Sequence, residues 1–139
     1  MSNRRFTLSL FALLMSFYIV FNSAAANAEP LDSTELQLQD IVFLLLGEPI
    51  ATAVDDFYSA AYNIHPVVYP YEIELEQLRR PNGNRSYPFL ITIVTTPVIG
   101  AHNSAGKDRI TFAISPGPII KLVNFEHIES YPLPPHLIH

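Results

Sequence analysis

Cysteine is absent from this chain of 139 residues, and its absence excludes several kinds of chemistry. Without thiols there is no disulfide, no thiolate metal site, no cysteine nucleophile and no cysteine that could carry a lipid. Stability must therefore come from the packing of a hydrophobic core. The length suits one domain with one modest core.

Basic residues are also scarce, because 8 Lys and Arg stand against 13 Asp and Glu. Two of the basic residues, Arg4 and Arg5, lie at the N-terminus. Without these two, 6 basic residues remain against 13 acidic ones, a formal charge of −7. Nucleic acids and anionic lipid surfaces bind basic footprints, so neither is expected as a partner.

The first 28 residues have the pattern of a secretory signal. Arg4 and Arg5 form a basic start, residues 6–21 form an apolar stretch, and residues 26–28 (Ala-Asn-Ala) form a small-residue cleavage site. The stretch is interrupted by polar residues and is shorter than the roughly 20 apolar residues that span a bilayer. We therefore predict a cleaved signal peptide over residues 1–28. No later segment has a spanning length, so no stable transmembrane segment is expected after cleavage.

The mature part, residues 29–139, begins with a pattern of two helices. Asp32 can cap the first, which we expect from Thr34 to Leu46. Gly47-Glu48-Pro49 should break or kink it, because proline removes a backbone donor and crowds the preceding turn. A second helix is predicted from Pro49 to about Asn63.

Four strands are predicted to follow the helices. Apolar and acidic residues alternate between Tyr71 and Leu78, which is typical of a half-buried strand. Asn82-Gly83 favours a reversing turn, so the apolar run from Tyr87 to Val98 should return antiparallel. Two further strands are expected at Arg109–Ile114 and Ile119–Ile128.

Helices grouped before strands predict an α+β fold, with two N-terminal helices packed on a four-stranded antiparallel meander. This outline is similar to cystatin-like and NTF2-like folds. Residues 131–139 are rich in proline and are expected to form an extended tail rather than a helix. Folds of this outline include enzymes and binding proteins, so the fold alone does not select a function.

The densest polar cluster lies in residues 100–108, between the second and third predicted strands. Two glycines allow unusual backbone angles, Asn103 can bond neighbouring amides, and Asp108 can accept several N–H groups at the end of the loop. A turn bonded to itself explains this composition. A binding surface formed by His102, Asn103 and Asp108 is the functional interpretation.

Meander topology brings this loop to the sheet edge at which the fourth strand ends, so the loop can approach Glu126 or His127. Side chains alternate along a strand, so only one of these two can join a given cluster. Convergence of His102, Asp108 and His127 would suit a zinc ion or an acid–base pair. The spacing matches no metal signature and no nucleophile motif, so we predict no metal, no cofactor and no catalytic residue.

Several segments of the mature chain resemble the family called domain of unknown function 3888 (DUF3888), which consists of small secreted proteins of Bacillus-type Firmicutes. These segments are Asp40–Leu46, Asp56–Tyr58, Pro97–His102, Gly106–Phe112, Phe125–Ile128 and Leu133–His136. The resemblance covers nearly all of the mature chain. It implies secretion and a single domain, and the family offers no activity, ligand or catalytic residue to transfer.

The sequence therefore predicts a secreted, non-catalytic binding or interaction module of the bacterial cell envelope. Its partner would be an envelope protein or a small ligand. The alternative is a small hydrolase or metal-dependent enzyme that uses His102, Asp108 and His127. A third possibility is a structural or regulatory protein whose Pro-rich tail docks another chain.

Overall fold

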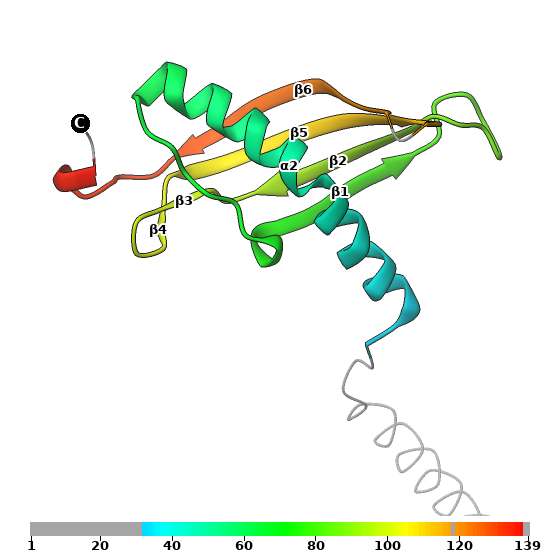
Figure 1. The fold of residues 1–139 in the computed structure, drawn as a ribbon, viewed down its shortest axis with the longest axis horizontal. Coiled ribbons are helices and arrows are strands. Elements are labelled where there is room, and N and C mark those ends of the chain that lie inside the picture. Colours follow the sequence, from blue (N-terminus) through cyan, green and yellow to red (C-terminus); the bar gives the residue numbers. More distant parts are fainter. Residues whose placement is uncertain (1–31, 118, 138–139) are drawn as a thin grey trace, which may run out of the picture. The chain divides into compact units, whose positions relative to one another are not determined.

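The computed structural model describes residues 32–117 and 119–137, so the predicted signal peptide lies outside the described residues. The sheet belongs to one compact unit of the chain, which begins at Leu38. Helix α2 is followed by a four-stranded antiparallel sheet in the order β1-β2-β5-β6 (Figure 1). The elements are α2 (Thr34–Tyr62), β1 (Ile73–Arg79), β2 (Phe89–Thr95), β5 (Gly106–Ser115) and β6 (Ile119–Ser130). The α+β class and the four-stranded meander are thereby confirmed.

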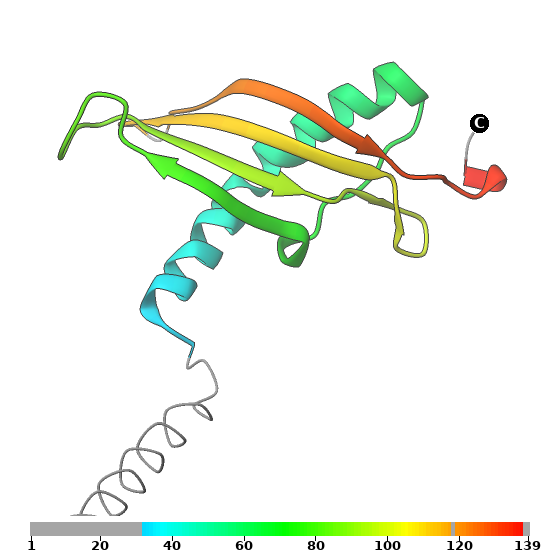
Figure 2. The ribbon, with the colours of Figure 1, turned by 180° about the vertical axis from the view of Figure 1, so that it is seen from behind.

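One α-helix occupies the region where two were predicted, so that prediction was wrong. Helix α2 continues through Pro49, and its ribbon changes direction near the middle (Figures 1 and 2). A proline inside a helix costs about 3 kcal/mol. The cost is offset because the apolar stripe continues on both sides of the proline and packs against the sheet. The buried stripe consists of Phe43, Leu46, Ile50, Ala53, Val54 and Tyr58. At the start of the helix, Ser33 rather than Asp32 accepts the backbone N–H of Leu36, at 3.1 Å.

Replacing Pro49 with alanine should stabilise the protein, because alanine restores the missing backbone hydrogen bond and removes the ring clash. We expect the free energy of unfolding to rise by roughly 1–2 kcal/mol, less than the full propensity difference because Pro49 is partly buried against its neighbours. Urea denaturation followed by circular dichroism measures this change. A variant no more stable than the wild type would mean that the helix is adapted to its proline.

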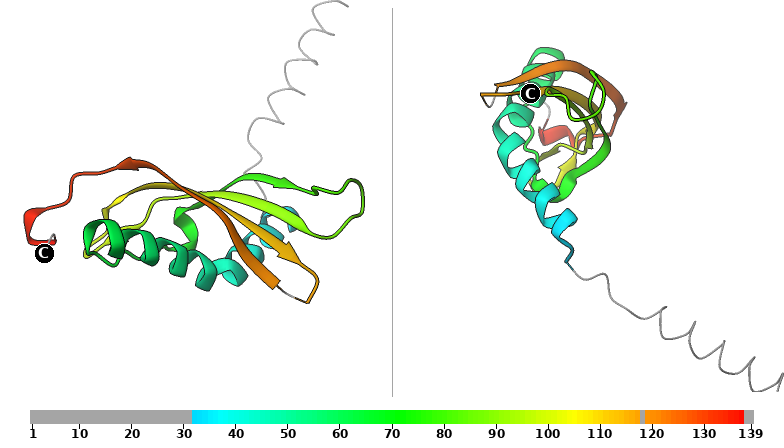
Figure 3. Two further views of the ribbon diagram at one scale, coloured as in Figure 1. Left: turned by 90° about the horizontal axis from the view of Figure 1, so that it is seen from above. Right: turned by 90° about the vertical axis from the view of Figure 1, so that its right-hand side faces the viewer.

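The core lies between α2 and one face of the sheet, as the two views of Figure 3 show. In the register of β2 and β5, Ile91 lies opposite Phe112 and Ile93 lies opposite Ile110. These four side chains are at most 2% exposed. Complete burial of a side chain of this size contributes about 1.5–3 kcal/mol, so this patch holds the helix to the sheet.

The other face of the sheet carries a cluster of charged residues. Arg109 of β5 donates from Nε to Glu76 at 2.8 Å and from Nη1 to Glu126 at 2.9 Å. All three side chains are at least 35% exposed, so water screens the ion pairs. Glu126 thus lies on the open face while its neighbour His127 lies on the core face, as the alternation of β6 predicts.

The polar loop is shorter than expected. Val98–Ile99 (β3) and Asn103–Ser104 (β4) form a small hairpin, and β5 begins at Gly106 rather than Arg109. Asp108 therefore lies inside a strand with no exposed surface, and its placement at the end of a loop was wrong.

The tail also differs from the prediction, since Pro135–Leu137 form one turn of 3-10 helix (η2). This turn requires a single backbone donor, the N–H of Leu137, which bonds the carbonyl of Pro134 at 2.9 Å, so the prolines do not prevent it. Between residues 32 and 137, leaving residue 118 aside, no helix combines the length and apolar character needed to cross a membrane.

Candidate functional site

A chain of hydrogen-bonded side chains links the buried core to the surface at one end of the sheet. Asp108 Oδ1 lies 2.6 Å from His127 Nδ1, and His127 Nε2 lies 2.7 Å from Ser130 Oγ. The exposed fraction rises along the chain, from 0% for the Asp108 side chain to 17% for that of His127, and Ser130 is exposed. A buried carboxylate thus connects through an imidazole to a solvent-facing hydroxyl.

A β-bulge in β6 brings His127 and Ser130 to the same face. In the pairing with β5, Gly106 lies opposite Ser130 and Asp108 lies opposite His127, while Ile128 has no partner. Without the extra residue, strict alternation would place residues 127 and 130 on opposite faces. Ser130 was absent from the predicted site for this reason, since no turn residue in the strand indicates a bulge.

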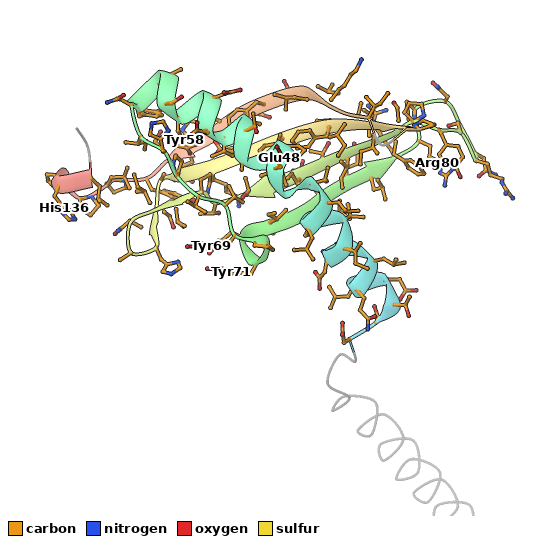
Figure 4. All side chains as sticks on the ribbon, in the orientation of Figure 1. Glu48, Tyr58, Tyr69, Tyr71, Arg80 and His136 are labelled. Carbon is orange, nitrogen blue, oxygen red and sulfur yellow. The ribbon has the colours of Figure 1, made fainter. Side chains whose placement is uncertain are left out.

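Aromatic side chains from α2 enclose the histidine. The rings of Phe57 and His127 lie 4.9 Å apart between centroids, and those of Tyr58 and His127 lie 5.7 Å apart, edge to face. Figure 4 labels Tyr58 on the half of α2 that lies over β5 and β6. These contacts hold the imidazole in place and shield the carboxylate behind it from water.

Burial dominates the electrostatics of the two deepest groups. It raises the pKa of Asp108, and interactions with His127 and the nearby Tyr58 hydroxyl oppose the rise. Burial and, after it, the Asp108 charge raise the pKa of Tyr58, so the phenol stays protonated. The Tyr58 hydroxyl and Asp108 Oδ2 are both buried, and no third group among the described residues bonds either of them. A hydrogen bond between the Tyr58 hydroxyl and the Asp108 carboxylate is among the causes of both pKa shifts.

One assignment of protons satisfies the whole chain. Neutral His127 donates from Nδ1 to ionised Asp108 and accepts the Ser130 hydroxyl proton at Nε2. The Ser130 oxygen then accepts from the Tyr62 hydroxyl, 3.2 Å away. In this state the network can pass a proton from Ser130 to His127 and stabilise the resulting imidazolium with Asp108.

A pocket of about 410 Å³ opens beside Ser130, between the C-terminal end of α2 and the segment after β6. Its volume lies within the range of small-molecule sites. Aliphatic and aromatic side chains form most of the wall, and the polar side chains among the lining residues carry hydroxyl groups. The lining residues are Tyr58, Tyr62, Ile64, Ala105, Ser130, Tyr131, Pro132 and Leu133.

Only part of the predicted site comes together. Asp108 and His127 are in contact, whereas His102 occupies the exposed turn of the β3–β4 hairpin, with its ring 5.4 Å from that of Tyr69. Asn103 donates its side-chain amide to the carbonyl of Ile99 at 3.3 Å, as expected of a turn bonded to itself. Across residues 32–117 and 119–137, no three His, Asp or Glu residues are grouped so that they could hold a metal ion.

Comparison with known proteins connects this chain to one family. The model of a family of proteins of unknown function, DUF3888, matches residues 38–129. This match includes Asp108 and His127 and ends one residue before Ser130. No curated protein and no solved structure shows significant similarity to the chain.

Proposed function

The chain belongs to the DUF3888 family of proteins of unknown function, and we propose that it is a secreted binding module of the bacterial cell envelope. Its ligand is a small molecule held in the pocket between α2 and the segment after β6. The N-terminal pattern of residues 1–28 supports secretion. The acidic, cysteine-free mature chain supports a ligand that is neither a nucleic acid nor an anionic lipid surface.

The observation that carries this proposal is the pocket itself, whose wall combines apolar side chains with hydroxyl-bearing ones. Its volume of about 410 Å³ suits a small molecule, and the exposed Ser130 lies in its wall. A ligand that covers the apolar wall would remove this surface from water and could hydrogen-bond a hydroxyl group at the rim, which supports a binding site here.

The wall of the pocket indicates the class of ligand. Tyr62 and Tyr131 present aromatic surface, while Ile64 and Leu133 present aliphatic surface. The buried Asp108 carboxylate behind Tyr58 disfavours an anion, because two negative charges would share a poorly solvated site. The ligand that fits is an uncharged ring compound carrying a hydroxyl group.

Binding of 4-methylphenol tests this proposal, since the probe combines an apolar ring with one hydroxyl. In ¹H–¹⁵N spectra of the purified protein, millimolar 4-methylphenol should shift the amide signals of residues 62, 105, 130, 131 and 133. Leu133→Trp should abolish the shifts, because the larger side chain fills the pocket. Leu78→Trp is the matched control. Leu78 is 56% exposed and lies near the end of β1 that leads to Arg80. Arg80 and Tyr58 lie at opposite ends of the sheet (Figure 4).

Two results would contradict the proposal. Absence of saturable shifts in the wild-type protein would remove the binding site. Equal shifts in the Leu133→Trp and wild-type proteins would place any binding elsewhere.

A further inference from the structure

We propose that Ser130 is a nucleophile, activated by His127 and Asp108, that cleaves carboxylic esters of small apolar acids. The inference goes beyond binding, and it rests on the proposed function in one respect, because the same pocket would receive the acyl group. The proposed site differs from that of the hydrolase predicted from the sequence. Ser130 joins Asp108 and His127, and the distant His102 takes no part.

The order and distances of the three groups support this role. A serine nucleophile needs a base within about 2.6–3.2 Å and a third group that orients the base. His127 Nε2 lies 2.7 Å from Ser130 Oγ, and Asp108 Oδ1 lies 2.6 Å from the other ring nitrogen. Asp108 is fully buried, so its charge acts on the imidazole with little screening by water.

The reaction balances with water as the only co-substrate. Ser130 Oγ forms a bond to the ester carbonyl carbon while its proton passes to His127 Nε2. The bond between that carbon and the alcohol oxygen then breaks, and Nε2 returns the proton to the departing alcohol. Water attacks the acyl-serine by the same proton route, which releases the carboxylic acid and restores Ser130.

Tyr62 supplies a donor for the negative charge that develops on the carbonyl oxygen. Its hydroxyl lies 3.2 Å from Ser130 Oγ, close to where the carbonyl oxygen would sit after attack. A phenol placed there stabilises the oxyanion more than it stabilises the neutral ester. Tyr62→Phe should therefore lower kcat by about 10- to 100-fold with little change in KM.

The acyl part of the ester has a defined place. Ser130 is in the wall of the pocket, next to Tyr131 and near the aliphatic side chains of Ile64 and Leu133. An acyl group attached to Ser130 can therefore extend over an apolar surface. Short aliphatic acyl groups fit this site better than acyl groups that carry a negative charge, because the lining contains no cationic side chain.

Covalent labelling tests the inference directly. The purified full-length protein is incubated with an alkyl fluorophosphonate, which bonds an activated serine through phosphorus and releases fluoride. Trypsin cleavage after Lys121 yields the peptide 122–139, in which Ser130 is the only serine. We expect one label on Ser130, none in Ser130→Ala, and a labelling rate about 100-fold lower in His127→Gln. Ser115→Ala, at the far end of β5, should label like the wild type.

Hydrolysis of 4-nitrophenyl butyrate by the same variants provides a second readout. Labelling of Tyr131 in place of Ser130, or no labelling of a protein whose circular dichroism shows it to be folded, would overturn the inference. The wild-type protein distinguishes this inference from the proposed function, because labelling of Ser130 and binding of 4-methylphenol are measured separately. In the wild-type protein, absence of labelling with binding intact contradicts only the nucleophile, whereas labelling without binding contradicts only the proposed ligand.

Discussion

Replacing His127 with alanine is expected to lower the free energy of unfolding by about 3–5 kcal/mol. The variant leaves the Asp108 carboxylate buried without the imidazole that bonds it at 2.6 Å. Removing one partner of a buried pair is costly because the remaining charge is shielded from water and keeps only the Tyr58 hydroxyl to stabilise it. Chemical denaturation at neutral pH measures the loss.

A second histidine–aspartate pair provides a matched control. His65 and Asp55 also lie 2.6 Å apart, but their side chains are 70% and 50% exposed. Water solvates Asp55 when its partner is removed, so His65→Ala should change the stability by less than about 1 kcal/mol. Equal losses in the two variants would show that burial of Asp108 does not determine the effect.

The pH dependence of the His127→Ala variant follows from the raised pKa of Asp108. Burial raises this pKa in the folded protein, whereas in the unfolded chain it is about 3.9. Between these two values the folded state binds more protons than the unfolded state, so the free energy of unfolding falls as the pH rises. Removing His127 removes an interaction that opposes the rise, so the variant should lose stability more steeply between mildly acidic and neutral pH than the wild type. Adding Asp108→Asn should abolish the difference in slope.

A methyl group on Gly106 is expected to cost about 3 kcal/mol of stability. A Cβ atom at this position would lie 2.5 Å from the backbone oxygen of Glu129, 2.5 Å from the Tyr58 hydroxyl and 2.8 Å from His127 Cε1. The backbone oxygen cannot move without disturbing the pairing of β5 with β6. Gly106→Ala should therefore also displace the His127 ring, which ¹H–¹⁵N spectra of the imidazole can detect.

Gly47 supplies the opposite expectation. Nothing lies within 4 Å of a Cβ atom at Gly47, which is in the interior of α2. Alanine has a higher helix propensity than glycine, so Gly47→Ala should add about 1 kcal/mol of stability. Thermal denaturation of both variants distinguishes a steric effect at Gly106 from a general effect of replacing glycine. A stable Gly106→Ala variant would mean that β6 can shift to accept the methyl group.

Local patterns in the sequence were sufficient to predict most of the sheet. Alternation between Tyr71 and Leu78 and the turn signal at Asn82-Gly83 led to the correct antiparallel pairing of β1 with β2. Alternation also separated Glu126 from His127, and the two do lie on opposite faces. These features depend on neighbouring residues, so a single sequence contains the information.

The errors concern features that depend on distant residues. Pro49 normally ends a helix, but burial of residues on both sides against the sheet keeps α2 continuous. The prediction that His102 would approach Asp108 assumed a wide loop, whereas the β3–β4 hairpin holds His102 in an exposed turn.

The amino-acid sequence by itself determined the α+β class, the meander and the alternation that directs His127 inward, because each follows from backbone geometry over a few residues. Tertiary structure alone decided the contents of the site. Pairing with β5 introduces the bulge at Ile128, and that one extra residue turns Ser130 to the face of His127. Packing of α2 over β5 and β6 then buries Asp108 and brings Tyr58 and Tyr62 to the same place, since burial is a property of the assembled core.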